Sequence, residues 1–188
     1  MPDSEPLWTS AEIEAATGGR LSGAPFAATG ITYNSREIVP GDLFVALKGA
    51  RDGHDFADMA FANGAAGAIV ERAVNGPAVI TGDTLHALEA LGVFSRERAP
   101  QVKRGAVTGS VGKTSVTQAT KAGLDLAGPA HASIKSYNNH IGVPLTLARM
   151  PRAVERAVFE IGMNAPGEIA PLSKFVKPHA PWVTKSGG

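Results

Sequence analysis

Cysteine is absent from this sequence of 188 residues, and aromatic residues make up only 6% of it. Without cysteine the chain can form no disulfide, no thiolate nucleophile and no cysteine-ligated zinc site. An excess of charge of one sign is also lacking, because 18 Lys and Arg residues are balanced by 17 Asp and Glu residues. A formal net charge of +1 disfavours a protein whose main task is to bind nucleic acid or an anionic membrane surface.

Long apolar runs are missing as well. No stretch approaches the ~20 consecutive apolar residues of a membrane-spanning helix. The first residues, MPDSEP, lack the basic start and apolar run of a signal peptide. We therefore expect a cytoplasmic protein with no stable membrane insertion. Hydrophobic residues still make up 44% of the chain, enough for the core of one good-sized domain or two small ones.

The first hundred residues carry alternating strand and helix signals. Thr9 with Glu12 forms the capping-box pattern of a helix start, and Asp55 is the expected cap of a second helix. Taken together, the patterns predict helices over 9–19, 55–64 and 83–98, and strands over 28–33, 42–47, 66–70 and 77–80. We expect a small α/β domain over residues 1–100.

A polar segment with a proline, 98–104, predicts a hinge. Beyond it, strands are expected over 105–108, 129–134, 156–161 and from about residue 180, and helices over 112–126, 143–150 and 167–176. Such alternation predicts a parallel sheet with helices on its faces. We expect a second domain over 101–188, with nothing packed on its last strand.

The most specific motif is TGSVGKTS at 108–115, which follows a short apolar strand and opens a helix. Glycines allow a tight turn whose N–H groups converge on one point, and the helix N-terminus adds partial positive charge. Lys113 can then reach the β- and γ-phosphates of a nucleotide, and Thr114 can bind magnesium. The motif departs from the usual phosphate loop because Val107 replaces the first glycine. A glycine-rich turn with a solvated lysine is the simpler alternative.

A carboxylate is expected near this loop, because a phosphate loop needs a second metal-side ligand. Glu160 ends the strand at 156–161, and ligands of open α/β sheets collect beyond the carboxyl ends of the strands. We therefore predict that Glu160 and Thr114 hold Mg²⁺. The alternative is a strand-end glutamate in solvent.

Three motifs in this order resemble the Mur ligase family. They are TGSVGKTS at 108–115, YNNHIGVPL at 137–145 and EIGMNAPGE at 160–168. The N-terminal segments NSREIVPGDLFVALKG (34–49), DGHDF (52–56) and NGAA (63–66) are similar to the UDP-binding domain of the same family. The resemblance covers residues 6–184.

The resemblance implies an ATP-dependent amide ligase of peptidoglycan precursor synthesis with ATP and Mg²⁺ as cofactors. The segments 138–144 and 160–164 resemble most the branch that joins D-alanyl-D-alanine to UDP-N-acetylmuramoyl-tripeptide through an acyl phosphate. Two alternatives stay open: a family member that adds a different amino acid, and a non-catalytic nucleotide-binding module.

The resemblance also assigns roles to individual residues. ATP would be held by Gly109, Ser110, Val111, Gly112, Lys113, Thr114 and Ser115, and magnesium by Thr114 and Glu160. The catalytic residues would be Lys113, Asn138, Asn139 and His140. The UDP-sugar substrate would contact Ser35, Arg36, Asp52, Gly53 and His54. Each has a simpler reading, since Ser35 and Arg36 suit a turn, His54 suits a helix cap and the asparagines suit any loop.

Family members resemble three-domain enzymes of well over twice this length. We therefore expect the front portion of such an enzyme, with an incomplete phosphate-loop domain, no C-terminal domain and no turnover by itself. The full-length enzyme is expected to be a monomer.

Overall fold

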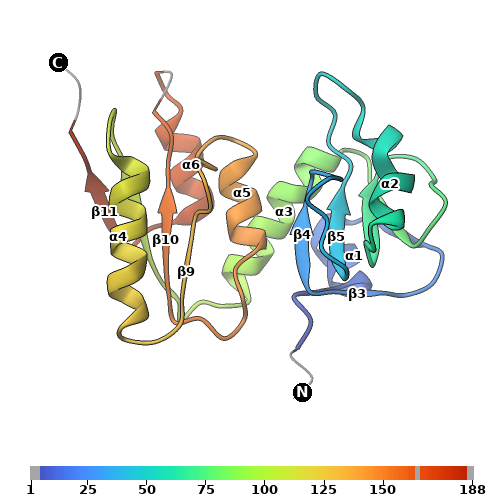
Figure 1. Cartoon of the computed structure of the whole chain (residues 1–188), viewed down its shortest axis with the longest axis horizontal. Helices are drawn as coiled ribbons and strands as arrows, with labels where there is room; N and C mark the ends of the chain where they lie inside the picture. The colour runs from blue at the N-terminus through green and yellow to red at the C-terminus, as the bar shows by residue number, and fades with distance from the viewer. Residues whose placement is uncertain (1–4, 164–165, 186–188) are drawn as a thin grey trace. The chain divides into compact units, whose positions relative to one another are not determined.

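The computed structural model describes residues 5–163 and 166–185, which form two compact units, Met1–Leu91 and Gly92–Gly188 (Figure 1). Asn164 of the third motif and the terminal residues 186–188 lie outside the described residues. The boundary falls inside helix α3 (Thr84–Glu97), ahead of the hinge predicted at 98–104. The end of α3 belongs to the second unit because Arg96 donates hydrogen bonds to main-chain carbonyls of helix α6 (Ile169–Val176).

The first unit is built on a five-stranded mixed sheet of order β2-β7-β6-β5-β4. Its strands are β2 (Arg20–Ser22), β4 (Gly30–Thr32), β5 (Asp42–Val45), β6 (Gly67–Val70) and β7 (Ala78–Ile80). The strands β4 to β7 run parallel, and β2 pairs antiparallel with β7. A separate pair joins β1 (Trp8–Thr9) to β3 (Ala27–Ala28). The strand predicted at 28–33 is therefore split, because Ala28 pairs with Trp8 whereas Gly30 pairs with Asp42.

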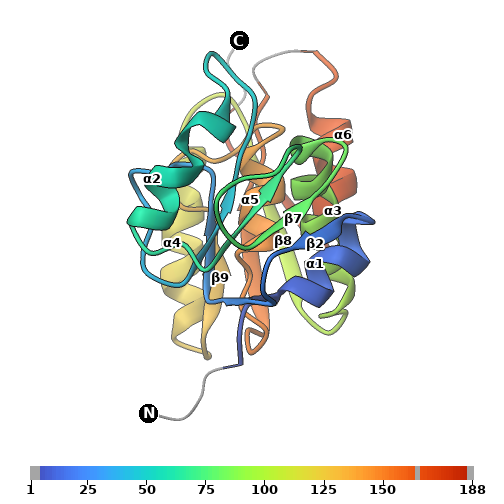
Figure 2. The ribbon, with the colours of Figure 1, turned by 90° about the vertical axis from the view of Figure 1, so that its right-hand side faces the viewer.

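The helices of the first unit confirm one predicted cap and correct another. Thr9 and Glu12 form the capping box of α1 (Ser10–Thr17), which lies alongside β2 and β7 (Figure 2). Asp55 was the wrong choice for the second cap. A 3₁₀ turn (Gly53–Phe56) precedes helix α2 (Ala57–Ala62), and it is the side chain of Asp52 that accepts the N–H of His54 at the start of that turn.

The second unit confirms the predicted parallel sheet. Its strands β8 (Lys103–Thr108), β9 (Ala130–Ala132), β10 (Arg156–Glu160) and β11 (Ala180–Val183) are arranged in the order β11-β8-β10-β9, all parallel. The other helices are α4 (Lys113–Asp125) and α5 (Gly142–Ala148). Alternate residues of β10 point to opposite faces of the sheet. Phe159 joins the apolar core beneath α5 and α6, and Val158 packs with Leu124 of α4 on the other face.

Among the described residues, β11 is an edge strand of this sheet and all four of its residues are exposed, as expected for a last strand with nothing packed on it. Its inner edge is nevertheless paired. β11 pairs along its length with β8, and the Trp182 ring covers Gly105, where an added Cβ would lie 2.3 Å from the ring. The arrows of β10 and β11 point the same way in Figure 1, so their carboxyl ends meet at one edge of the sheet. Within the described part of the chain, no helix is long and apolar enough to cross a bilayer.

Candidate functional site

The predicted phosphate loop connects β8 to α4 at this edge. Gly109 (φ +135°) and Gly112 (φ +86°) adopt backbone conformations that favour glycine, which explains why the sequence places glycine there. The Lys113 ammonium donates a 2.7 Å hydrogen bond to the carbonyl of Gly109. An ammonium has three N–H donors, so two remain for other oxygen atoms. The loop therefore combines a helix N-terminus with a fixed cation.

Glu160 is the centre of the cluster beside the loop. Its side chain is almost fully buried, at 1% exposure, so it is not a solvent-facing strand end. The Thr114 hydroxyl donates to Oε2 at 2.9 Å, and the Asn138 amide donates to Oε1 at 2.7 Å. Burying a carboxylate is costly unless donors satisfy its oxygens, and these two contacts do so. The structure thus brings together three predicted site residues from three elements.

The neighbouring residues of the Asn138 loop are used differently. The Asn139 side-chain oxygen accepts N–H groups from Ile141 (3.1 Å) and Gly142 (2.8 Å), so it shapes the start of α5. His140 is exposed on the same loop. Sequence reasoning missed Ser133, whose hydroxyl accepts the backbone N–H of Glu160 at 2.9 Å. No pattern marks it, because the contact joins the residue after β9 to the last residue of β10, 27 residues apart.

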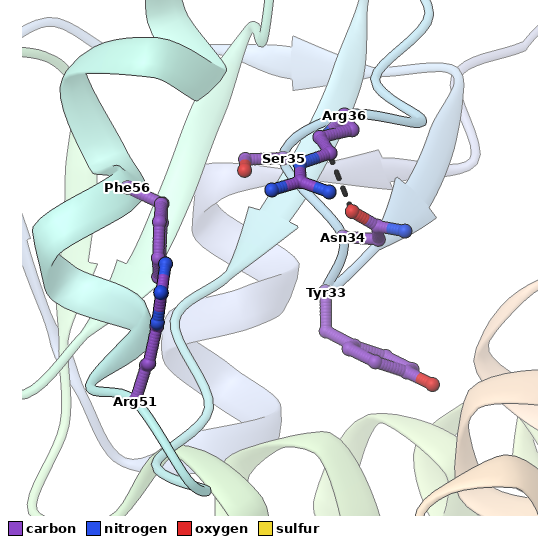
Figure 3. Close-up of a pocket in the computed structure, with 6 residues that line it drawn as sticks. All are labelled: Tyr33, Asn34, Ser35, Arg36, Arg51 and Phe56. Carbon is purple, nitrogen blue, oxygen red and sulfur yellow. Dashed lines mark hydrogen bonds between the residues drawn. The ribbon is translucent and has the colours of Figure 1, made fainter.

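A second candidate site lies in the first unit, at the carboxyl ends of β4 and β5. It is an open cavity of about 390 Å³. Its described lining consists of Tyr33, Asn34, Ser35, Arg36, Arg51 and Phe56. Figure 3 shows the Arg36 guanidinium pointing into the space between Arg51 and Phe56 on one side and Tyr33 on the other. Two cations and two aromatic rings suit an anionic ligand that carries a flat ring.

A turn holds the backbone at Arg36. The Asn34 side-chain oxygen accepts the N–H of Arg36 at 3.1 Å, as the dashed line in Figure 3 marks. Ser35 is buried, and its hydroxyl lies 3.5 Å from the sulfur of Met59. Both predicted residues, Ser35 and Arg36, thus line the cavity, but the arginine carries the charge. Tyr33, Arg51 and Phe56 were missed, because no spacing rule connects them.

The loop after Arg51 holds the remaining predicted substrate residues, and their side chains bond to the protein itself. His54 is buried, with Nδ1 2.5 Å from Asp52 and Nε2 accepting the N–H of Glu71 at 2.7 Å. These contacts assign a neutral ring with its proton on Nδ1. The guanidinium of Arg72 and then His54 hold the pKa of Asp52 well below its ordinary value. Among the described residues, neither Asp52 nor His54 lines the cavity.

In the second unit, a strand of a parallel sheet leads into a glycine-rich GKT loop and then a helix, and a buried acid lies beside the loop. These features define the class of phosphate-loop α/β proteins. Comparison with family models refines this class. The model described as the Mur ligase middle domain matches residues 107–186, and the model described as the Mur ligase family, catalytic domain, matches residues 27–133. The second match covers more than half of the chain, so the chain belongs to the Mur ligase family. This confirms the family expected from the motifs.

Individual relatives are UDP-N-acetylmuramoyl-tripeptide--D-alanyl-D-alanine ligases. The chain is 40% identical to that of Escherichia coli (strain K12) over 92% of its own length and 38% of the relative's. It is 36% identical to that of Rickettsia prowazekii, over 92% of its own length and 39% of the relative's. The chain therefore spans about two fifths of these homologues.

Solved structures of the same family resemble this chain. MurF from Acinetobacter baumannii superposes with a TM-score of 0.82 at 35% identity, over 96% of this chain and 40% of that one. MurF from Thermotoga maritima in complex with ADP gives a TM-score of 0.64 at 31% identity, over 79% of this chain and 35% of that one. The α/β fold predicted from the sequence is confirmed.

Proposed function

We propose that this chain is part of an ATP-dependent ligase of peptidoglycan synthesis. The whole enzyme would join D-alanyl-D-alanine to UDP-N-acetylmuramoyl-tripeptide through an acyl phosphate. The observation that carries the proposal is the cluster of Thr114, Asn138 and buried Glu160 beside the phosphate loop. Homology to UDP-N-acetylmuramoyl-tripeptide--D-alanyl-D-alanine ligases supports the choice of substrates, and the ADP complex of a homologue supports the nucleotide.

Magnesium fits the chemistry of the cluster. Mg²⁺ prefers oxygen ligands at about 2.0–2.1 Å in octahedral geometry, which places neighbouring ligand oxygens roughly 2.9 Å apart. The Thr114 hydroxyl and the Glu160 carboxylate are 2.9 Å apart. Among the described residues, no group of three or more His, Cys, Asp or Glu side chains is arranged so that it could hold a metal ion. This agrees with an ion that takes few protein ligands and completes its shell with phosphate and water. Bound there, the ion would neutralise phosphate charge.

The residues of the second unit would then share one electrostatic task. Transfer of a phosphoryl group to a carboxylate concentrates negative charge, and a preorganised site lowers the barrier by opposing that charge. Lys113 and the N–H groups of the loop would bind the phosphate oxygens. Asn138 would hold the Glu160 carboxylate in position, and His140 is open to the adjoining solvent.

The cavity of the first unit is the proposed site for the UDP end of the sugar substrate. Arg36 and Arg51 would bind the diphosphate, since a guanidinium group can donate two parallel hydrogen bonds to two phosphate oxygens. Tyr33 and Phe56 offer apolar rings to the uracil. Asp52, Gly53 and His54 would act indirectly, by fixing the loop that carries Arg51.

Calorimetric titration of the 188-residue chain tests both sites separately. We expect saturable binding of Mg·ATP that Lys113→Ala weakens, and saturable binding of UDP-N-acetylmuramoyl-tripeptide that Arg36→Ala weakens. Removing a charge-assisted contact should reduce affinity about tenfold or more. The exposed cations Lys174 and Arg20 give matched controls, Lys174→Ala and Arg20→Ala. A folded chain, verified by circular dichroism, that binds neither ligand would contradict the proposal.

A further inference from the structure

The end of β11 is bonded directly to the phosphate loop. The backbone N–H of Thr184 donates to the carbonyl of Thr108 at 2.8 Å, and its hydroxyl donates to the carbonyl of Val111 at 2.7 Å. The N–H of Ser110 donates to the carbonyl of Lys185 at 3.1 Å. Three hydrogen bonds therefore connect the loop to a segment more than seventy residues away.

Gly109 makes room for this contact. A Cβ added at Gly109 would lie 2.0 Å from the Thr184 hydroxyl oxygen, closer than any van der Waals contact. The φ of +135° at the same residue separately favours glycine. The hydroxyl of Thr184 thus occupies the space that a side chain on the loop would fill.

The hydroxyl bond also sets the orientation of one peptide group. In a trans peptide, the carbonyl and the next N–H point in opposite directions. The Val111 carbonyl is held toward Thr184, so the N–H of Gly112 is turned away from β11. Val111 itself is 70% exposed, so little packing of its own side chain holds this peptide. In phosphate loops, backbone N–H groups are the phosphate ligands, and the direction of each decides whether it binds.

We propose that Thr184 is a positioning residue of the phosphate loop: through its hydroxyl it orients the Val111–Gly112 peptide for binding nucleotide phosphate. The proposal rests on the nucleotide site proposed above. Thr184 lies outside the loop motif, yet it would help to set the shape of the loop. The proposal predicts that the hydroxyl, not the bulk of the side chain, has this effect.

The test compares Thr184→Val, which keeps the shape and removes the hydroxyl, with Thr184→Ser, which keeps the hydroxyl. Thr117→Val is the matched control, because Thr117 is fully buried in α4 and its hydroxyl has no hydrogen-bond partner among the described residues. Hydrogen exchange of the Ser110 and Gly112 amides is measured without nucleotide, and Mg·ATP affinity is measured by titration. Thermal unfolding shows whether each variant is folded, and Thr184→Ala replaces the valine variant if that one is not.

We expect Thr184→Val to raise the exchange rates and to weaken Mg·ATP binding, each by about three- to tenfold, the effect of one hydrogen bond. Thr184→Ser and Thr117→Val should match the unsubstituted chain in both measurements. Unchanged loop exchange in folded Thr184→Val would overturn the positioning role. If the unsubstituted chain binds no Mg·ATP, the proposed function fails, and the exchange rates alone decide whether Thr184 orders the loop.

Discussion

The hydroxyl of Thr114 donates a 2.9 Å hydrogen bond to the carboxylate of Glu160, 46 residues further along the chain. One residue lies in the first turn of α4, and the other ends β10. Because β8 and β10 are parallel neighbours, the loop after one and the last residue of the other meet at the same edge. The two predicted magnesium ligands are thereby placed side by side.

Glu160→Gln should separate a metal role from a structural one. The amide keeps the size of the side chain and removes its charge, so Mg·ATP affinity should fall about tenfold or more. ATP binding measured in EDTA should be unchanged or tighter, because a negative charge near the phosphates has been removed. Glu155→Gln is the control, since Glu155 is exposed and immediately precedes the first residue of the same strand. Equal losses with and without magnesium would argue for a purely structural Glu160.

Gly53→Ala should destabilise the first unit through packing rather than through lost substrate contact. An added Cβ would lie 2.5 Å from the carbonyl oxygen of Leu47, and main-chain atoms cannot move away easily. Overpacking of this kind costs about 1–3 kcal/mol. Gly49→Ala is the control, because an added Cβ there has no atom within 4 Å. Urea unfolding followed by the emission of buried Trp8, in a Trp182→Phe background, measures the difference. Similar midpoints for both variants would refute the packing argument.

Arg104→Met should destabilise the second unit. The buried guanidinium of Arg104 donates to the carbonyls of Val176 (2.8 Å) and Lys177 (3.4 Å) at the C-terminus of α6. Burial, and then the charge of Arg96, hold the pKa of Arg104 below its ordinary value. Methionine fills similar space but leaves those carbonyls without donors, at a cost of about 1–3 kcal/mol.

The Arg104 measurement can be restricted to one unit, because the chain has only two tryptophans. In a Trp8→Phe background, Trp182 alone reports unfolding of the second unit. Lys174→Met is the control, since Lys174 is exposed on α6. The prediction does not survive if both methionine variants unfold at the same urea concentration.

His131 should make the second unit less stable in mild acid. Burial holds the pKa of His131 at about 4, and its Nε2 lies 2.7 Å from the carbonyl of Thr146. The unfolded chain takes up a proton near pH 6.5 and the folded chain only near pH 4, so stability is full above pH 6.5 and falls as the pH drops toward 4. The loss between pH 7 and pH 5 should be on the order of 1 kcal/mol.

Urea midpoints at pH 7 and pH 5 measure this loss. His131→Gln removes the titrating ring, so its two midpoints should differ less than those of the unsubstituted chain. His86→Gln serves as the control, because the His86 side chain is exposed. An equal acid loss in His131→Gln would show that other groups are responsible.

The start of a helix could be predicted from the sequence where the capping residues are close together along the chain. Thr9 and Glu12 are three residues apart, so the capping box could be read directly and is present. Asp55 shows the limit of such reading. The helical segment begins with a 3₁₀ turn at Gly53, so Asp52 is its cap and Asp55 lies inside the turn.

The class of fold and the position of the phosphate loop could be predicted from the sequence, because strand, glycine turn, lysine and helix are neighbours along the chain. The sequence also placed Glu160 at a strand end. The contacts of those residues could not be predicted, because their partners are distant in the sequence. Asn138 reaches Glu160, and Thr184 fills the space over Gly109, because parallel strands bring distant segments to one edge. The cavity around Arg36 and Arg51 arises in the same way, because the loops that line it follow two neighbouring strands. No local sequence pattern connects the side chains of these two loops.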